Sequence, residues 1–168
     1  TILPPYGIPF YETFEHAGDM PEAWSQENVQ GDWSWTFRTG SPQGHPVNAY
    51  SNQYNAFFGI ENPTQYVTRL VSPQIDFGAD VRAAQMTFWY CNESWINSQD
   101  ELRIYYKTSV DGDWTLIDSC LTSVAQWTLR TVTLPEPGRT YFVAFEGKAR
   151  YGYGICLDEI RIFDPTPP

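Results

Sequence analysis

The chain has few of the residues on which most metal centres and nucleophilic active sites depend. Its 168 residues include three cysteines, Cys91, Cys120 and Cys156, and two histidines, His16 and His45. An odd number of cysteines without C-x-x-C spacing argues against a disulfide framework and against a common zinc site. We expect all three cysteines to be small buried residues; one disulfide plus one free thiol is the alternative.

Positive charge and long apolar runs are scarce as well. Ten Lys and Arg stand against twenty Asp and Glu, a net charge of −10, which repels nucleic acid and anionic lipid. No apolar run approaches the ~18 residues of a membrane helix, and the N-terminus lacks a secretory leader. We therefore predict no nucleic-acid partner and no membrane insertion. The Pro-rich ends, 1–9 and 164–168, are expected to be linkers to neighbouring domains, leaving one domain over 10–163.

Helical periodicity is also missing, because apolar residues nowhere recur at i, i+3, i+4 and i+7 over a dozen positions. Alternation with period two is frequent instead, for example over 84–90 and 101–107, and "DGD" at 111–113 is a good hairpin turn. Short strands with turns at this spacing predict a jelly-roll β-sandwich of two antiparallel sheets. Segment 18–44 is weakly periodic, so we expect a long ordered loop there with one strand at "DWSWTF".

A series of short motifs follows in a fixed order: "YETFE", "PEAW", "DWSWTF", "GHP", "YNAFFG", "TRLVSPQIDF", "MTFWY", "LRIYY", "WTLRTVTL", "FVAFEG" and "GICLDEIRI". This ordered set resembles the MAM domain, and it is most similar to the bacterial MAM-like branch that includes the cleaved adhesin domains. The resemblance covers roughly Pro9 to Phe163. It departs from animal MAM domains because the cysteine pair around the first "FE" to "W" segment is missing, so no disulfide carries over.

The resemblance implies a jelly roll without catalysis, in a secreted or cell-surface multidomain bacterial protein. Such monomeric modules serve adhesion to a host or matrix protein, or contact a glycan beside a catalytic domain. We therefore expect an adhesion module, with a carbohydrate-binding module as the alternative and a spacer without ligand as the third hypothesis.

Two carboxylates, Asp158 and Glu159, interrupt the last predicted strand, "GYGICLDEIRIF". First and last strands of a jelly roll are often neighbours, and Glu15 lies in the first. Two buried carboxylates would repel each other unless a cation such as Ca²⁺ lay between them. The resemblance likewise implies a structural calcium held by Glu15 and Asp158. The remaining candidate ligands, in falling order, are Asp32, Asn55 and Asp19. Alternatively, Asp158 caps a bend and Glu15 pairs with an Arg or Lys; Glu159 is expected in solvent.

Signals of catalysis are poor. Neither histidine lies in H-E-x-x-H, and "GSPQG" is not a nucleophile elbow. The acid pairs considered for a glycosidase are Glu93 with Asp100 and Glu146 with Asp158; they would need a separation of ~5–9 Å across a cleft. We therefore predict no catalytic residues.

Aromatic residues are abundant, at 17% of the chain. Trp24, Trp33 and Trp35 resemble packing tryptophans of the family and are predicted to lie in the core. Trp95, Tyr151 and Tyr153 stand among polar residues and glycines in predicted loops, where aromatic faces suit sugar rings or protein hot spots. We predict that these three bind the ligand; the alternative is that they fold back over one end of the sandwich.

Overall fold

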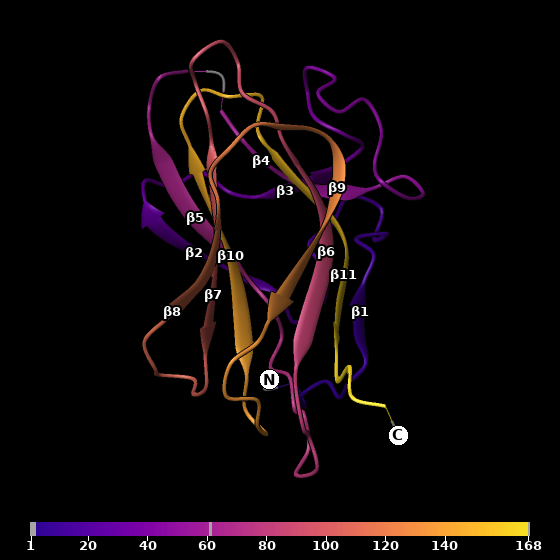
Figure 1. Cartoon of the computed structure of the whole chain (residues 1–168). Helices are drawn as coiled ribbons and strands as arrows, with labels where there is room; N and C mark the ends of the chain where they lie inside the picture. Colours follow the sequence, from indigo (N-terminus) through magenta and orange to yellow (C-terminus); the bar gives the residue numbers. More distant parts are fainter. Residues whose placement is uncertain (1–2, 61, 168) are drawn as a thin grey trace.

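The computed structural model describes residues 3–60 and 62–167 and has two packed layers of strands (Figure 1). The first sheet has the order β3 (Thr36–Arg38), β4 (Asn55–Phe58), β11 (Ile155–Phe163), β6 (Gln85–Asn92) and β9 (Val124–Thr133), and β1 (Phe10–Glu12) also pairs with β11. The second has the order β2 (Ser25–Gln30), β5 (Tyr66–Val71), β10 (Phe142–Ala149), β7 (Glu101–Lys107) and β8 (Thr115–Cys120). Every paired neighbour is antiparallel. The predicted β-sandwich is confirmed.

The alternating residues of the predicted strands fill the space between the sheets. Met86 and Phe88 on β6 and Leu102 and Ile104 on β7 are all fully buried. Phe88 meets Phe145 of the opposite sheet edge-on, with ring centroids 5.2 Å apart. Period two therefore identified the core face correctly, because successive side chains of a strand point to opposite sides.

Segment 18–44 contains two strands, β2 and β3, where the sequence indicated an ordered loop with one strand. Strand β2 lies at an edge and pairs only with β5. Most of its side chains, from the sequence "SQENVQ", are exposed or half-buried. An edge strand needs little apolar alternation because it buries neither face fully. For this reason the period-two pattern did not predict β2.

The three cysteines are all buried and free, which confirms the expectation from the sequence. Cys91 on β6 lies opposite Cys156 on β11, and both pack against Phe57. Burial raises the pKa of the Cys91 thiol to about 12, which leaves it protonated and unreactive at neutral pH.

The two acids of the last strand mark a β-bulge. Leu157 and Ile160 both enter the core, so two residues lie between them instead of one. The pairing of β11 with β6 shifts between Asp158 and Arg161, and Glu159 has a φ of 50°. The extra residue also lets β11 pair with β4 before the bulge and with β1 after it. The expectation that the first and last strands are neighbours is confirmed. Glu15, however, follows β1 and is not part of that strand.

The connection between β3 and β4, the 39–54 loop, lies over the outer face of the six-stranded sheet; it is the purple loop on the right of Figure 1. Tyr50 of this loop stacks on Trp89 of β6, with centroids 4.0 Å apart. Trp127 of β9 donates from Nε1 to the Asn48 carbonyl at 3.0 Å. The outward-pointing side chains of Asn55 on β4 and of Cys156 and Asp158 on β11 are therefore buried beneath this loop rather than exposed.

The segment before β1 contacts the sandwich. The Tyr6 N–H donates to the Gln74 carbonyl, and the Asp76 N–H donates to the Tyr6 carbonyl. The Tyr6 ring also meets Phe10 edge-on at 5.6 Å. The boundary of the domain at residue 10 stays a prediction. Over the described part of the chain, no helix has the length and apolar character to cross a membrane.

A salt bridge joins the free edges of the two sheets. Arg130 of β9 donates to both carboxylate oxygens of Asp118 of β8, each at 2.8 Å, and the Arg130 guanidinium lowers the pKa of Asp118. Because both side chains are partly exposed, we expect Asp118→Asn to cost only about 1 kcal/mol at pH 7.

The sign of the pH dependence follows from the lowered pKa. Ionised Asp118 stabilises the fold above the unfolded value of 3.8, and this stabilisation is lost as pH falls through the folded pKa. Urea unfolding of the wild type and Asp118→Asn at pH 7 and pH 3 measures it. The gap between the two proteins should narrow at pH 3; a constant gap would contradict the role of the ion pair.

A candidate ligand-binding groove and a carboxylate pair

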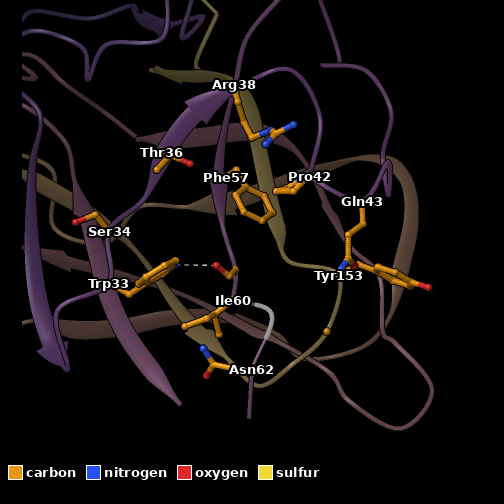
Figure 2. Close-up of a pocket in the computed structure, with 12 residues that line it drawn as sticks. Trp33, Ser34, Thr36, Arg38, Pro42, Gln43, Phe57, Ile60, Asn62 and Tyr153 are labelled. Atoms are coloured by element: carbon orange, nitrogen blue, oxygen red, sulfur yellow. Dashed lines mark hydrogen bonds between the residues drawn. The ribbon is translucent and has the colours of Figure 1, made fainter. Parts of the chain in front are cut away.

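A pocket of about 390 Å³ opens at the β3–β4 edge of the six-stranded sheet. In Figure 2, Trp33 and Tyr153 stand on opposite sides of the opening with Phe57 between them. The other lining residues are Ser34, Thr36, Arg38, Pro42, Gln43, Gly59, Ile60, Asn62 and Gly152. The pocket therefore combines three aromatic rings with hydroxyl, amide and guanidinium groups.

Trp33 does not lie in the core, and that prediction was wrong. Its side chain is 42% exposed, whereas Trp35 is 2% exposed. The two residues precede β3 in an irregular stretch, so strand alternation does not put them on the same side. Trp33 donates from Nε1 to the Gly59 carbonyl at 2.8 Å and packs against Tyr66 at 5.8 Å. These contacts hold one face of the indole toward the pocket.

Tyr153 is held from the other side by the 39–54 loop. Its ring stacks on His45 with centroids 3.8 Å apart and an interplanar angle of 13°. His45 Nδ1 lies 3.1 Å from Glu93 Oε1. The imidazole of His45 therefore supports an aromatic wall of the pocket.

Asp100 fixes the backbone of the 150–154 turn, which carries Tyr151 and Tyr153. The Asp100 carboxylate is buried and accepts backbone N–H bonds from Arg150 at 2.6 Å, Gly152 at 3.1 Å and Gly154 at 2.8 Å. One carboxylate thus replaces the hydrogen bonds that a regular strand would supply to this turn.

A second pocket of about 250 Å³ adjoins the first and shares Gln43, Ile60 and Gly152 with it. Trp95 and Tyr151 line this second pocket and meet edge-on at 5.0 Å. We call the two pockets together the aromatic groove, after its five aromatic residues: Trp33, Phe57, Tyr153, Tyr151 and Trp95.

The three aromatic residues predicted to bind a ligand thus come together in one concave surface. Tyr151 and Tyr153 lie in the 150–154 turn, and Trp95 reaches them from the β6–β7 connection. Sequence reasoning missed Trp33 and Phe57. The one available signal was that Trp33 stands among polar residues in "GDWSW".

The two carboxylates predicted to hold calcium both contact the 39–54 loop. Glu15 accepts backbone N–H bonds from Gln53 at 3.1 Å and Tyr54 at 2.8 Å. Asp158 accepts one from Ser51 at 3.2 Å, and another from Glu159 at 2.8 Å that caps the bulge. The capping of a bend by Asp158, the alternative considered above, is therefore present. Glu15 contacts backbone amides rather than an Arg or Lys.

Other predicted calcium ligands have different surroundings. Asn55 is fully buried and occupied: its Oδ1 accepts from the Gly40 N–H at 2.7 Å and its Nδ2 donates to the Gly40 and Ala56 carbonyls. Asp32 and Asp19 are exposed. Within residues 3–60 and 62–167, no three His, Cys, Asp or Glu side chains gather to hold a metal. The acidic part of such a site is thus limited to two carboxylates.

The neighbourhood of Asp158 nevertheless disfavours the charged form of its carboxyl group. Burial, with added repulsion from Glu159 and Glu15, raises the pKa of Asp158 to about 7. Among the described residues, Ser51 Oγ and Glu159 Oε2 are buried without a hydrogen-bond partner. Glu159, which was expected in solvent, is therefore only partly exposed, and its Oε1 accepts from the Tyr11 hydroxyl. Unpartnered oxygens beside two carboxylates fit the chemistry of a hard cation.

The acids considered for glycosidase chemistry serve the fold. Asp100 accepts the three amides described above, and Glu146 accepts from Arg69 Nε at 3.0 Å. Glu93 contacts His45. Among the residues that the structure describes, neither proposed pair faces a cleft as two available carboxylates.

Comparison with solved structures supports the same architecture. The K1 cleaved adhesin domain of Lys-gingipain from Porphyromonas gingivalis W83 superposes with a TM-score of 0.74 at 20% identity, over 95% of this chain and 100% of that one. The CBM22-1 xylan-binding domain of Paenibacillus barcinonensis Xyn10C gives 0.59 at 10% identity, over 99% and 100%.

A third neighbour, TmCBM61 in complex with beta-1,4-galactotriose, gives a TM-score of 0.60 at 11% identity, over 85% of this chain and 89% of that one. No curated protein matches the sequence. The model of the MAM domain, meprin/A5/mu, matches residues 13–166. The chain therefore belongs to the MAM domain family.

Proposed function

We propose that this domain is a non-catalytic module that binds a glycan in the aromatic groove. The observation that carries the proposal is the placement of Trp33 and Tyr153 on opposite sides of one pocket, with Phe57 between them. Flat apolar rings complement the C–H faces of sugars, and surrounding polar groups satisfy the hydroxyls. The groove offers both, through Thr36, Asn62 and its aromatic walls.

Two of the similar folds support a sugar ligand over other classes. The Paenibacillus domain is a xylan-binding domain and TmCBM61 is in complex with a galactotriose, and both superpose on most of this chain. Their identity to this chain is low, so the proposal rests on the groove and takes only the choice of test sugars from them.

A binding screen tests the proposal. Xylo-, galacto- and manno-oligosaccharides are titrated into the wild-type domain and into two variants, and binding is measured by calorimetry. Trp33→Ala should weaken the best ligand at least about tenfold, because one stacking face is lost. Trp114→Ala is the control. Trp114 is a half-buried tryptophan next to β8 on the other sheet, where its Nε1 donates to Glu27. Its removal should leave sugar binding unchanged. Equal effects of both variants, or no binding by any sugar, would contradict the proposal.

We also propose that a structural Ca²⁺ is held by the carboxylates of Glu15 and Asp158 and by Ser51 Oγ. Two observations support this choice: Ser51 Oγ has no hydrogen-bond partner, and no cationic side chain among the described residues pairs with either acid. A bound cation would offset the repulsion between the two acids and so fasten the 39–54 loop to β11.

Calcium should therefore stabilise the domain. At a free concentration of about 100 Kd we expect a gain of about 2.7 kcal/mol, or roughly 5–10 °C in Tm, over the chelated protein. Calorimetry in CaCl₂ and in EGTA measures it. Glu15→Gln with Asp158→Asn should abolish the shift, and Asp19→Asn, an exposed acid, should retain it. A shift that survives the double substitution would place calcium elsewhere.

Protein adhesion is a second candidate function, favoured by apolar side chains near the exposed sheet edges. Leu116, Leu121 and Leu129, on or between β8 and β9, are 44–51% exposed. Adhesion would be supported if the domain binds an extracellular-matrix protein, if Leu129→Ser abolishes this binding, and if Trp33→Ala leaves it intact. In either case we place the module outside the cell, beside other domains of its chain, in keeping with its family.

A further inference from the structure

We propose that the aromatic groove selects a glycan that bears an isolated uronic acid, and that Arg38 recognises its carboxylate. This inference rests on the proposed glycan function and specifies its ligand. Arg38 is the one charged side chain among the described residues that line the first pocket. It lies at the rim beside Phe57 and Pro42 (Figure 2).

Strand geometry aims Arg38 at the ligand rather than at the core. On β3, Phe37 is buried between the sheets, so Thr36 and Arg38 on either side of it point outward. Thr36 lies opposite Phe57 in the pairing of β3 with β4. The Arg38 guanidinium therefore lies on the same face of the sheet as the Phe57 ring of the pocket.

Arg38 also lacks the partner that most arginines of this chain have. Arg69, Arg103, Arg130, Arg139 and Arg150 each contact a carboxylate within 4.0 Å. Arg38 donates from Nε to the adjacent Thr39 carbonyl at 3.4 Å, and no carboxylate of the described residues forms an ion pair with it. A guanidinium presents paired N–H donors that match a carboxylate in bidentate geometry.

The net charge of the protein limits the kind of acid. At −10 the domain repels a chain that carries a charge on every residue. One acidic group on an otherwise neutral glycan avoids this repulsion and still pairs with the single cation of the pocket. We therefore assign a neutral oligosaccharide with one uronic acid substituent, rather than a polyuronate or a sulfated polymer.

The test compares matched sugars by calorimetry. Xylo- and galacto-oligosaccharides are each offered with and without one uronic acid group, together with an oligogalacturonate. We expect an acid-bearing form to bind about tenfold more tightly than its neutral partner, and raising NaCl from 50 to 500 mM should reduce this preference. The oligogalacturonate should bind no better than the neutral sugars.

Two variants separate this inference from the glycan function. Arg38→Gln should lose the preference and bind the acidic and neutral forms with equal affinity. Arg38→Lys should retain part of the preference, which shows that the site is folded. Equal affinity of the wild type for both forms, or equal weakening of both by Arg38→Gln, would overturn the role of Arg38 and leave the glycan function standing. No binding by any sugar would overturn both.

Discussion

Asp100→Ala is expected to destabilise the domain by about 3–5 kcal/mol, because three backbone N–H groups lose their partner in a buried site. Asp100 is 1% exposed, and the amides are those of Arg150, Gly152 and Gly154. For a domain of this size such a loss lowers Tm by about 10 °C. Thermal unfolding of the purified variant measures it.

The same substitution should also weaken glycan binding, since the 150–154 turn carries Tyr151 and Tyr153 into the aromatic groove. Measured well below the new Tm, the folded variant should bind at least about tenfold more weakly. Asp164→Ala is the matched control. Asp164 likewise accepts backbone N–H bonds, from Arg82 and Thr166. Its side chain is only half-buried, however, and it does not line the aromatic groove. If Asp164→Ala lost as much stability as Asp100→Ala, burial of the Asp100 carboxylate would not be the cause of the large effect.

Gly40→Ala is the second substitution with a large expected effect. Gly40 has a φ of 61°, and a Cβ there would lie well inside contact distance of the Pro46 and Val47 carbonyl oxygens. Its N–H and carbonyl are also clamped by the buried Asn55 side chain. Backbone oxygens cannot rotate away as a side chain can. We expect a loss of about 4 kcal/mol from backbone strain and overpacking together.

Gly78→Ala provides the control for that substitution. Gly78 also has a positive φ, 81°, but a Cβ there would meet nothing within 4 Å. Gly78→Ala should therefore lower the free energy of unfolding by the cost of backbone strain alone, about 1–2 kcal/mol. Denaturant unfolding of both variants isolates the contribution of the close contact. Equal losses would mean that the 39–54 loop moves freely and does not form a fixed cover.

The β-sandwich and its core were determined by the sequence itself. Alternation on β6 and β7 is a local property, because the side-chain period of a strand is two whatever surrounds it. Met86, Phe88, Leu102 and Ile104 could therefore be assigned to the core without a structure. The ordered motifs supplied the family in the same way, since they lie at fixed positions along the chain.

Only the tertiary structure decided what lies on the outer face of the six-stranded sheet. The sequence placed Asp158 in a strand, but its burial depends on the 39–54 loop, which comes from more than 100 residues earlier in the chain. Trp33 was assigned to the core on resemblance, yet its irregular backbone turns it into the groove. Loops carry no period, and what they cover depends on contacts between distant residues. For this reason the strands could be predicted from the sequence, whereas the groove between the loops could not.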